Sequence, residues 1–292
     1  FKQKTAYEIM PSLVGSEMCI RDRIDEGQIL MGVKGKVKSL YWDGHALWVG
    51  GEMDYFVRFN PETFEWQYFY LDDLPGIVNE VTSIVGTGEK IFIGTDRGLF
   101  ASNLKEISWG KVTKLSEREI TVLKFDQENL WVGTSSGLYA LTKTGIQSFL
   151  IKTRINDIEL DENGIWVATP LGVFYGTKTG YKEIVDTQHI LRKGVNKIYI
   201  DKNAVYFGTY NGLVVLKNNE WKYYGFPNLP SDEVLAINGD KNYIWVGTGN
   251  GVAYFEKTNE KLTRRNFYPS PPELGKVYKI LITKREKTAS FI

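Results

Sequence analysis

The pentapeptide LWVGT at residues 130–134 recurs along the chain in closely related versions. The other copies are LWVGG (47–51), IFIGT (91–95), IWVAT (165–169), VYFGT (205–209) and IWVGT (244–248). Their aromatic residues follow one another at intervals of 44, 39, 35, 40 and 39 residues. Five of the six copies continue to a glycine and an apolar residue, as in SSGLY (135–139). A repeat of this length indicates one supersecondary unit per copy.

A second apolar pattern lies upstream of every copy at a constant distance. We number as position 0 the residue that stands eleven places before each aromatic. This position holds Val37, Val81, Ile120, Ile155, Val195 and Val234. Position +3 holds Leu40, Ile84, Leu123, Ile158, Ile198 and Ile237, and position +11 holds Trp48, Phe92, Trp131, Trp166, Tyr206 and Trp245. Side chains alternate along a strand, so we expect positions 0 and +3 to point to opposite faces. Burial of both faces is expected where a blade packs between two others.

One repeat shows the expected elements. ITVLKF, LWVGT, LYALT and IQSFLI, between residues 120 and 151, read as four short strands separated by DQEN, SSG and KTG. We expect the glycines at +13 and +17 to flank a tight turn, where a small side chain or a positive φ is needed. Four strands in every 40 residues or so predict an all-β fold, a β-propeller of four-stranded blades.

The two ends of the chain carry pieces of a further repeat. KVYKILI (276–282) has the inner-strand pattern with Val277 and Ile280, ASFI (289–292) would be the next strand, and GQILMGV (27–33) reads as an outermost strand. We therefore expect seven blades, the seventh incomplete or completed from elsewhere. On this interpretation residues 24–292 form a single propeller domain, a fragment truncated in its last blade.

The composition is that of an ordinary globular protein. Of the 292 residues, 42% are hydrophobic and 24% charged, and the net charge is +1. Lysine and arginine are dispersed, so we expect no nucleic-acid partner. No run of 18 apolar residues is present, so we expect no membrane insertion in this segment. The single cysteine, Cys19, excludes an internal disulfide and a multi-cysteine metal site.

Two stretches carry a family resemblance. NLWVGTSSGLYAL (129–141) and NLPSDEVLAINGDKNYIWVGTGNGVAYF (228–255) resemble the two-component regulator propeller repeat, over roughly residues 34–282. In that family such propellers form the periplasmic or extracellular sensor half of membrane-bound, often hybrid, histidine kinases. Related propellers occur in secreted or surface proteins that have no kinase.

The resemblance implies a ligand-binding sensor located in the periplasm or outside the cell, in a parent protein that may be anchored in the inner membrane and may dimerise. The partner would be a small molecule, a glycan or a neighbouring protein domain. This chain has no phosphoacceptor-histidine helix and no Gly-rich ATP box, so we expect no enzyme activity and no cofactor. The alternative is a structural or docking propeller of a secreted or surface protein. A third hypothesis is a propeller lyase or glycosidase, but the sequence shows no recognisable pair of catalytic carboxylates.

The candidate ligand-binding residues lie in loops expected on one face of the ring. They are Arg97, Arg118, Arg154, Arg192, Tyr210, Asn211 and Asn250. The four arginines could converge on an anionic or sugar-acid ligand, because guanidinium groups bind carboxylates well. The alternative is that they pair with adjacent acids of the same loops. The aromatics at +11 and the Gly-Thr pairs are expected to be structural. His45 and His189 are expected on opposite faces, so we predict no metal site.

The segment YEIMPSLVGSEMCIRDR (7–23) shares nothing with the repeat. It resembles a translated sequencing-adapter read-through of the kind found at the ends of metagenomic proteins. We interpret residues 1–23 as non-native and disordered, and place the start of the protein near Ile24.

Overall fold

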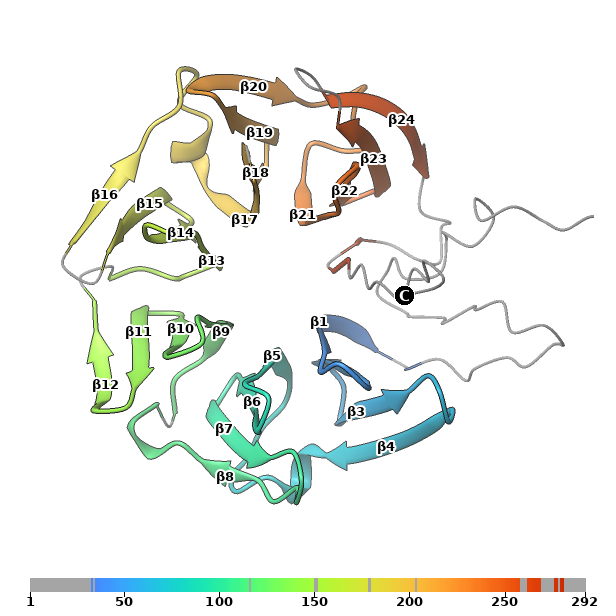
Figure 1. Cartoon of the computed structure of the whole chain (residues 1–292), viewed down its shortest axis with the longest axis vertical. Helices are drawn as coiled ribbons and strands as arrows, with labels where there is room; N and C mark the ends of the chain where they lie inside the picture. Colours follow the sequence, from blue (N-terminus) through green and yellow to red (C-terminus); the bar gives the residue numbers. More distant parts are fainter. Residues whose placement is uncertain are drawn as a thin grey trace, which may run out of the picture.

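The computed structural model describes residues 33, 35–115, 117–149, 152–177, 180–202, 204–257, 262–268, 276–277 and 279–280. Their strands form six antiparallel four-stranded sheets, each made of consecutive strands. Figure 1 shows these sheets in chain order around a ring, with one strand of each nearest the centre. We call them blades 1 to 6. The prediction of an all-β propeller of four-stranded blades is confirmed.

The strands have the following bounds. The innermost are β1 (Lys36–Trp42), β5 (Val81–Gly86), β9 (Ile120–Phe125), β13 (Asp157–Leu160), β17 (Val195–Asp201) and β21 (Val234–Gly239). The second are β2 (Leu47–Glu52), β6 (Lys90–Thr95), β10 (Leu130–Thr134), β14 (Ile165–Thr169), β18 (Ala204–Thr209) and β22 (Tyr243–Thr248). The third are β3 (Tyr55–Asn60), β7 (Gly98–Asn103), β11 (Gly137–Thr142), β15 (Gly172–Thr177), β19 (Gly212–Lys217) and β23 (Gly251–Lys257).

The outermost strands are β4 (Glu65–Tyr70), β8 (Gly110–Lys111), β12 (Gly145–Ser148), β16 (Gly180–Ile184), β20 (Glu220–Tyr224) and β24 (Leu262–Tyr268). Within the described part of the chain, three 3-10 turns lie in the links between blades: η2 (Leu71–Asp73), η3 (Thr113–Leu115) and η4 (Leu191–Lys193). None of the helical segments among the described residues could span a bilayer.

The expectation of seven blades is not met, because the described residues form six. The next repeat is described only at Lys276, Val277, Lys279 and Ile280, which join no described sheet. These residues nevertheless lie between blade 6 and β1 (Figure 1). The N–H of Val277 donates to the Thr248 carbonyl at 3.1 Å, as the N–H of Ile155 donates to the Thr134 carbonyl at 3.0 Å. The predicted N-terminal segment and the strands at 27–33 and 289–292 lie outside the described residues, apart from Val33.

A β-bulge in the inner strand contradicts the expected facing of its apolar residues. In blade 2, Val81 pairs with Thr95 but Ser83 pairs with Gly94, so one extra residue lies between them. Positions 0 and +3 therefore share a face: a Cβ built on Gly50 of blade 1 would meet both Val81 and Ile84. The same shift occurs in β1, β9, β17 and β21.

The inner strand is still buried on both faces, for a different reason from the one expected. In blades 1 and 2 the serine at position +2 faces the following blade, where its side chain meets a backbone N–H. Ser39 Oγ accepts from Ile84 N–H at 2.8 Å, and Ser83 Oγ accepts from Leu123 N–H at 3.0 Å. Both serines are buried. These contacts tie blade 1 to blade 2 and blade 2 to blade 3.

The glycines at +13 serve close packing between blades and not a turn. They lie inside the second strand, and a Cβ on Gly94 would approach Ile120 Cγ2 of the next blade to 2.5 Å. The turn itself is capped by the threonine at +14, as the sequence predicts. Thr95 Oγ1 donates to the Gly98 carbonyl and accepts from Arg97 N–H. Thr134, Thr169, Thr209 and Thr248 repeat this arrangement.

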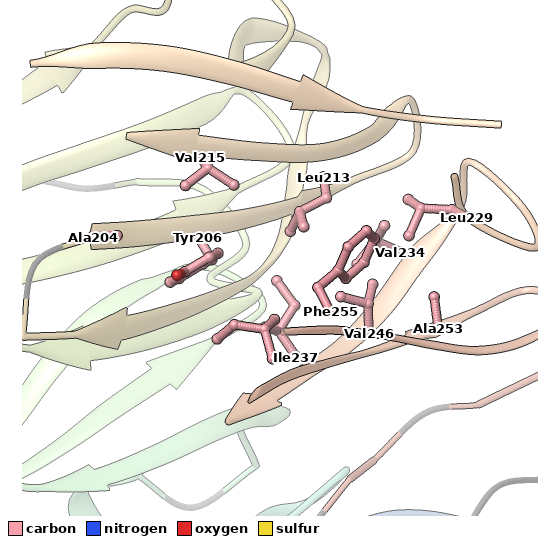
Figure 2. Close-up of a cluster of buried hydrophobic side chains, with 11 residues drawn as sticks. Ala204, Tyr206, Leu213, Val215, Leu229, Val234, Ile237, Val246, Ala253 and Phe255 are labelled. Carbon is pink, nitrogen blue, oxygen red and sulfur yellow. The ribbon is translucent and has the colours of Figure 1, made fainter. Parts of the chain in front are cut away.

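The hydrophobic core is divided among the joints between blades. Figure 2 shows one such cluster, in which Tyr206 and Leu213 of blade 5 pack with Val234, Ile237 and Phe255 of blade 6. The predicted structural role of the +11 aromatics is confirmed by their burial. Three of their indoles also donate to the aspartate of the preceding turn, as Trp131 Nε1 does to Asp126 Oδ2 at 2.7 Å. The other two pairs are Trp48 with Asp43 and Trp166 with Asp161.

Candidate functional site

The turns between second and third strands lie on the same face of the ring as the links between blades. We call this surface the loop face. Backbone hydrogen bonds join the two kinds of loop: Glu117 N–H donates to the Arg97 carbonyl at 3.3 Å, and Ser135 N–H to the Glu119 carbonyl at 3.1 Å. Gly249 N–H donates likewise to the Glu233 carbonyl at 2.9 Å. This contact confirms the placement expected from the topology and fixes the backbone of the face.

Three of the four candidate arginines contact carboxylates on this face. Arg97 Nε lies 3.8 Å from Asp96 Oδ2, and Arg154 Nη1 lies 2.8 Å from Glu119 Oε1. Arg192 Nε lies 2.7 Å from Glu183 Oε1, and this pair raises the pKa of Arg192. About half of each of these arginine side chains is exposed. Water screens such exposed pairs, so a ligand could replace the carboxylate.

The fourth arginine is held by neutral partners. Arg118 Nη1 donates to Ser136 Oγ at 3.1 Å, and its guanidinium lies over the ring of Tyr139 at 5.1 Å from the centroid. Ser136 lies in the turn of blade 3, and Arg118 lies in the link that enters that blade. The arginines thus stand at successive positions of the ring, each against a neighbour of its own, and their convergence on one ligand stays a prediction.

The three other candidate residues stand in turns with a fixed backbone. The N–H groups of Asn211 and Asn250 donate to the hydroxyls of Thr209 and Thr248 at 2.9 and 3.2 Å. Tyr210 is 55% exposed. Their side chains are therefore free to face solvent while their positions are set by the threonine cap.

The loop face also exposes apolar side chains. Tyr210 was predicted from the sequence as a candidate residue, and the others were not. Leu171 occupies the turn of blade 4, and Phe226 lies in the link between blades 5 and 6; they are 63% and 75% exposed. Val185 and Ile77 lie in other links and are also exposed. The sequence contains a signal for Leu171, because this turn carries an aliphatic residue. The corresponding turns of other repeats consist of DR, SS, YN and GN.

A second candidate site lies at the centre of the ring. The inner strands β1, β5, β9, β13 and β17, together with Lys279, line a cavity of about 400 Å³. We call it the central channel. Its lining comes from positions +2 to +5 of successive repeats, and its charged side chains stand at +2 and +4. Sequence reasoning missed this site, although charged residues at +2 and +4, such as Lys124, Asp157 and Lys197, are a signal for it.

Ion pairs between neighbouring blades line the central channel. Lys124 Nζ lies 2.7 Å from both carboxylate oxygens of Glu159, and Lys197 Nζ lies 2.7 Å from Asp157 Oδ1. Burial raises the pKa of Glu159, which the charge of Lys124 opposes. The charge of Lys197, with burial, lowers the pKa of Lys279 to about 7. The channel therefore holds two ion pairs and a third lysine.

The described residues include no group of three His, Cys, Asp or Glu side chains that could bind a metal ion. His45 lies in the turn between β1 and β2, and His189 lies in the link before η4. These two connections leave the ring on opposite faces, as expected.

No family model matches the chain, and no curated protein sequence matches it. Solved propeller structures do resemble it. A computationally designed protein, Ika8, has a TM-score of 0.64 at 12% identity, with 88% of this chain and 82% of that chain covered.

Two bacterial structures are also similar. One is described as the extracellular domain of a hybrid two-component system from B. thetaiotaomicron, with a TM-score of 0.57 at 18% identity over 88% of this chain. The other is PorZ of Porphyromonas gingivalis, a surface component of the type-IX secretion system, with a TM-score of 0.63 at 14% identity over 84% of this chain. The chain spans 38% and 34% of the length of these two. At these identities the likeness shows the β-propeller fold.

Proposed function

We propose that this chain is a ligand-binding sensor propeller that works in the periplasm or outside the cell, as part of a bacterial two-component signalling protein. In this proposal the chain catalyses no reaction, and a kinase would belong to another part of the parent protein. The resemblance of the repeats to the two-component regulator propeller supports it. The likeness to an extracellular domain of a two-component system supports it as well.

One observation on the loop face carries the proposal: weakly held cations stand beside exposed apolar side chains on a fixed backbone. A Cβ built on Gly172 would lie 3.8 Å from Arg192 Cα, so Arg192 adjoins the turn that exposes Leu171. Tyr210 follows in the turn of the next blade. An aromatic ring can cover the apolar face of a sugar while a guanidinium binds a carboxylate. The ligand class that fits is an anionic small molecule or a glycan with sugar acids.

Calorimetric titration of the full chain with uronic-acid oligosaccharides tests this proposal. We expect Arg192→Ala and Tyr210→Ala each to weaken binding about tenfold, as the loss of a charge-assisted contact would. Lys241→Ala is the matched control, because Lys241 lies in an exposed turn on the opposite face. Equal affinity in all three variants would remove these residues from the site.

A docking propeller is the second candidate, and the exposed Phe226, Leu171 and Val185 favour it. In that case the loop face would bind a neighbouring domain or a second copy of the chain. Analytical ultracentrifugation distinguishes the two functions. Self-association that disappears in Phe226→Asp supports docking, whereas a monomer at every concentration together with glycan binding supports the sensor.

We further propose that residues 276–280 begin a seventh blade within a single domain over residues 24–292, and that residues 1–23 are not native to it. Val277 supports the first part, because its contacts repeat those of Ile155 at the joint between blades 3 and 4. A stability measurement on Val277 variants, described below, tests this assignment.

A further inference from the structure

The described lining of the central channel carries more positive than negative charge. Its cations are Lys124, Lys197 and Lys279, and its anions are Asp157 and Glu159. Such an excess is costly wherever burial reduces the screening of charges by water.

The two carboxylates are each bound by donors other than the third lysine. Both oxygens of Glu159 accept from Lys124. Asp157 accepts from Lys197 through Oδ1 and from the N–H of Ile198 through Oδ2, at 2.7 and 2.9 Å. Glu159 therefore binds a cation, and Asp157 binds both a cation and a backbone donor.

Lys279 is consequently left beside another cation. It lies against Lys197, whose charge is the largest cause of its lowered pKa. Within the described part of the chain, no carboxylate lies within ion-pair distance of Lys279. Two neighbouring ammonium groups that share a cavity provide donors for an anion placed between them.

Hydroxyl groups add further donors. Ser39 and Ser83 line the channel, and each uses its oxygen to accept a backbone N–H from the next blade. A serine that accepts in this way keeps its own O–H for donation. These hydroxyls can therefore donate to an acceptor-rich ligand.

We propose that the central channel is a binding site for a small oxyanion, held by Lys279 and Lys197. The ligand is a carboxylate or an inorganic oxyanion, since both present several acceptor oxygens on a compact negative group. A cavity of about 400 Å³ has room for such a ligand with water. The site is distinct from the loop face and does not rest on the function proposed above.

Calorimetric titration of the full chain with sodium sulfate, and separately with sodium malonate, tests the proposal at low ionic strength. Sulfate keeps its charge throughout the neutral pH range, and malonate represents the carboxylates. Sodium chloride at equal ionic strength controls for screening. Binding of either probe above the chloride control supports the site, and failure of both overturns it.

Two variants locate the binding. Lys279→Met removes the charge and keeps the length of the side chain, and Lys241→Met is the control in an exposed turn on the face opposite the loop face. We expect the affinity to fall at least about tenfold in Lys279→Met, as expected for losing a hydrogen bond to a charged group. It should be unchanged in Lys241→Met. Equal affinity in Lys279→Met and the unmodified chain overturns the proposal.

Proton uptake provides a test that needs no variant. The groups that face Lys279 are Lys197, Asp157 and Lys124, with Glu159 bound to the last. An anion stabilises protonated Lys279, so binding at about pH 8 must take up protons, and uptake must decline toward about pH 6, where Lys279 is already charged. Titrations in two buffers of different ionisation enthalpy measure this uptake. Sulfate binding at about pH 8 without proton uptake would contradict a role for Lys279.

Discussion

Ile120 of blade 3 occupies the space that a side chain at Gly94 of blade 2 would need. A Cβ at Gly94 would come within 2.5 Å of Ile120 Cγ2. The same relationship joins Gly50 to Val81, Gly133 to Ile155, Gly208 to Val234 and Gly247 to Val277. Five joints between successive repeats are thus built from a glycine at position +13 of one repeat and position 0 of the next, and the joint between blades 4 and 5 has Ala168 at +13.

The substitution Gly94→Ala is expected to destabilise the protein. The added methyl group must displace Ile120 or the strand behind it, which costs about 1–3 kcal/mol in a packed core. Urea unfolding measures the free energy of unfolding. Gly180→Ala is the control, because a Cβ there would meet no atom within 4 Å. Equal stability of the two variants would show that the joint accommodates a methyl group, as it does at Ala168.

The substitution Val277→Ala tests whether residues 276–280 belong to the ring. Val277 is fully buried, so loss of its two methyl groups should lower the free energy of unfolding by about 1–3 kcal/mol. Val185→Ala, at an exposed site, should change it by less than about 0.5 kcal/mol. An unchanged stability in Val277→Ala would mean that blade 6 does not depend on this contact.

The turn aspartates predict a loss of stability in acid. Burial acts to raise the pKa of Asp126, but hydrogen bonds from Asn129, Trp131 and Glu128 outweigh it, and the net pKa lies below the ordinary value. A lowered pKa in the folded state stabilises the fold above the unfolded-state pKa of about 3.9, and this contribution is lost as the pH falls through the folded-state pKa.

Asp126→Asn should therefore be less stable than the unmodified chain at neutral pH, by about 1–2 kcal/mol. The difference should shrink below about pH 4, where the aspartate itself becomes protonated. Thermal unfolding followed by circular dichroism across this range measures it. A difference that persists unchanged in acid would assign the effect to shape and not to charge.

The loop-face arginines should be dispensable for folding. In Arg118→Ala/Arg154→Ala, the lost contacts are about half exposed and cost less than about 1 kcal/mol each. Binding of an anionic saccharide should become weaker in this variant. The midpoint temperature of unfolding should stay within a few degrees of the unmodified chain, because such small energies shift it by about that much. Unchanged binding would exclude these two arginines as ligand contacts.

Much of the fold is predictable from the repeat, because strand order, turn capping and buried aromatics all lie within one unit of sequence. LWVGT marks β10 and GLYALT marks β11 without reference to any other blade. The bulge between Val81 and Ser83 is not predictable in this way, because it exists only in the pairing with Gly94 and Thr95. The facing of Ile84 was wrong for that reason.

The central channel could not be predicted from one repeat either. Lys124, Asp157 and Lys197 stand in three different units and meet only when their blades lie side by side. No single copy of the repeat shows that the charges balance in two pairs and leave Lys279 over. The loop-face arginines were placed on the correct face, because topology alone decides which connections leave the ring together.

The joint between Gly94 and Ile120 also bears on how such a ring can change in size over evolutionary time. At these joints, position +13 of one repeat is the receiving half and position 0 of the next is the inserting half. A tandem duplication of one repeat would therefore bring in a matched pair of halves, and a deletion would remove one. Blades can be gained or lost by recombination within the gene without any new interface having to arise by point mutation.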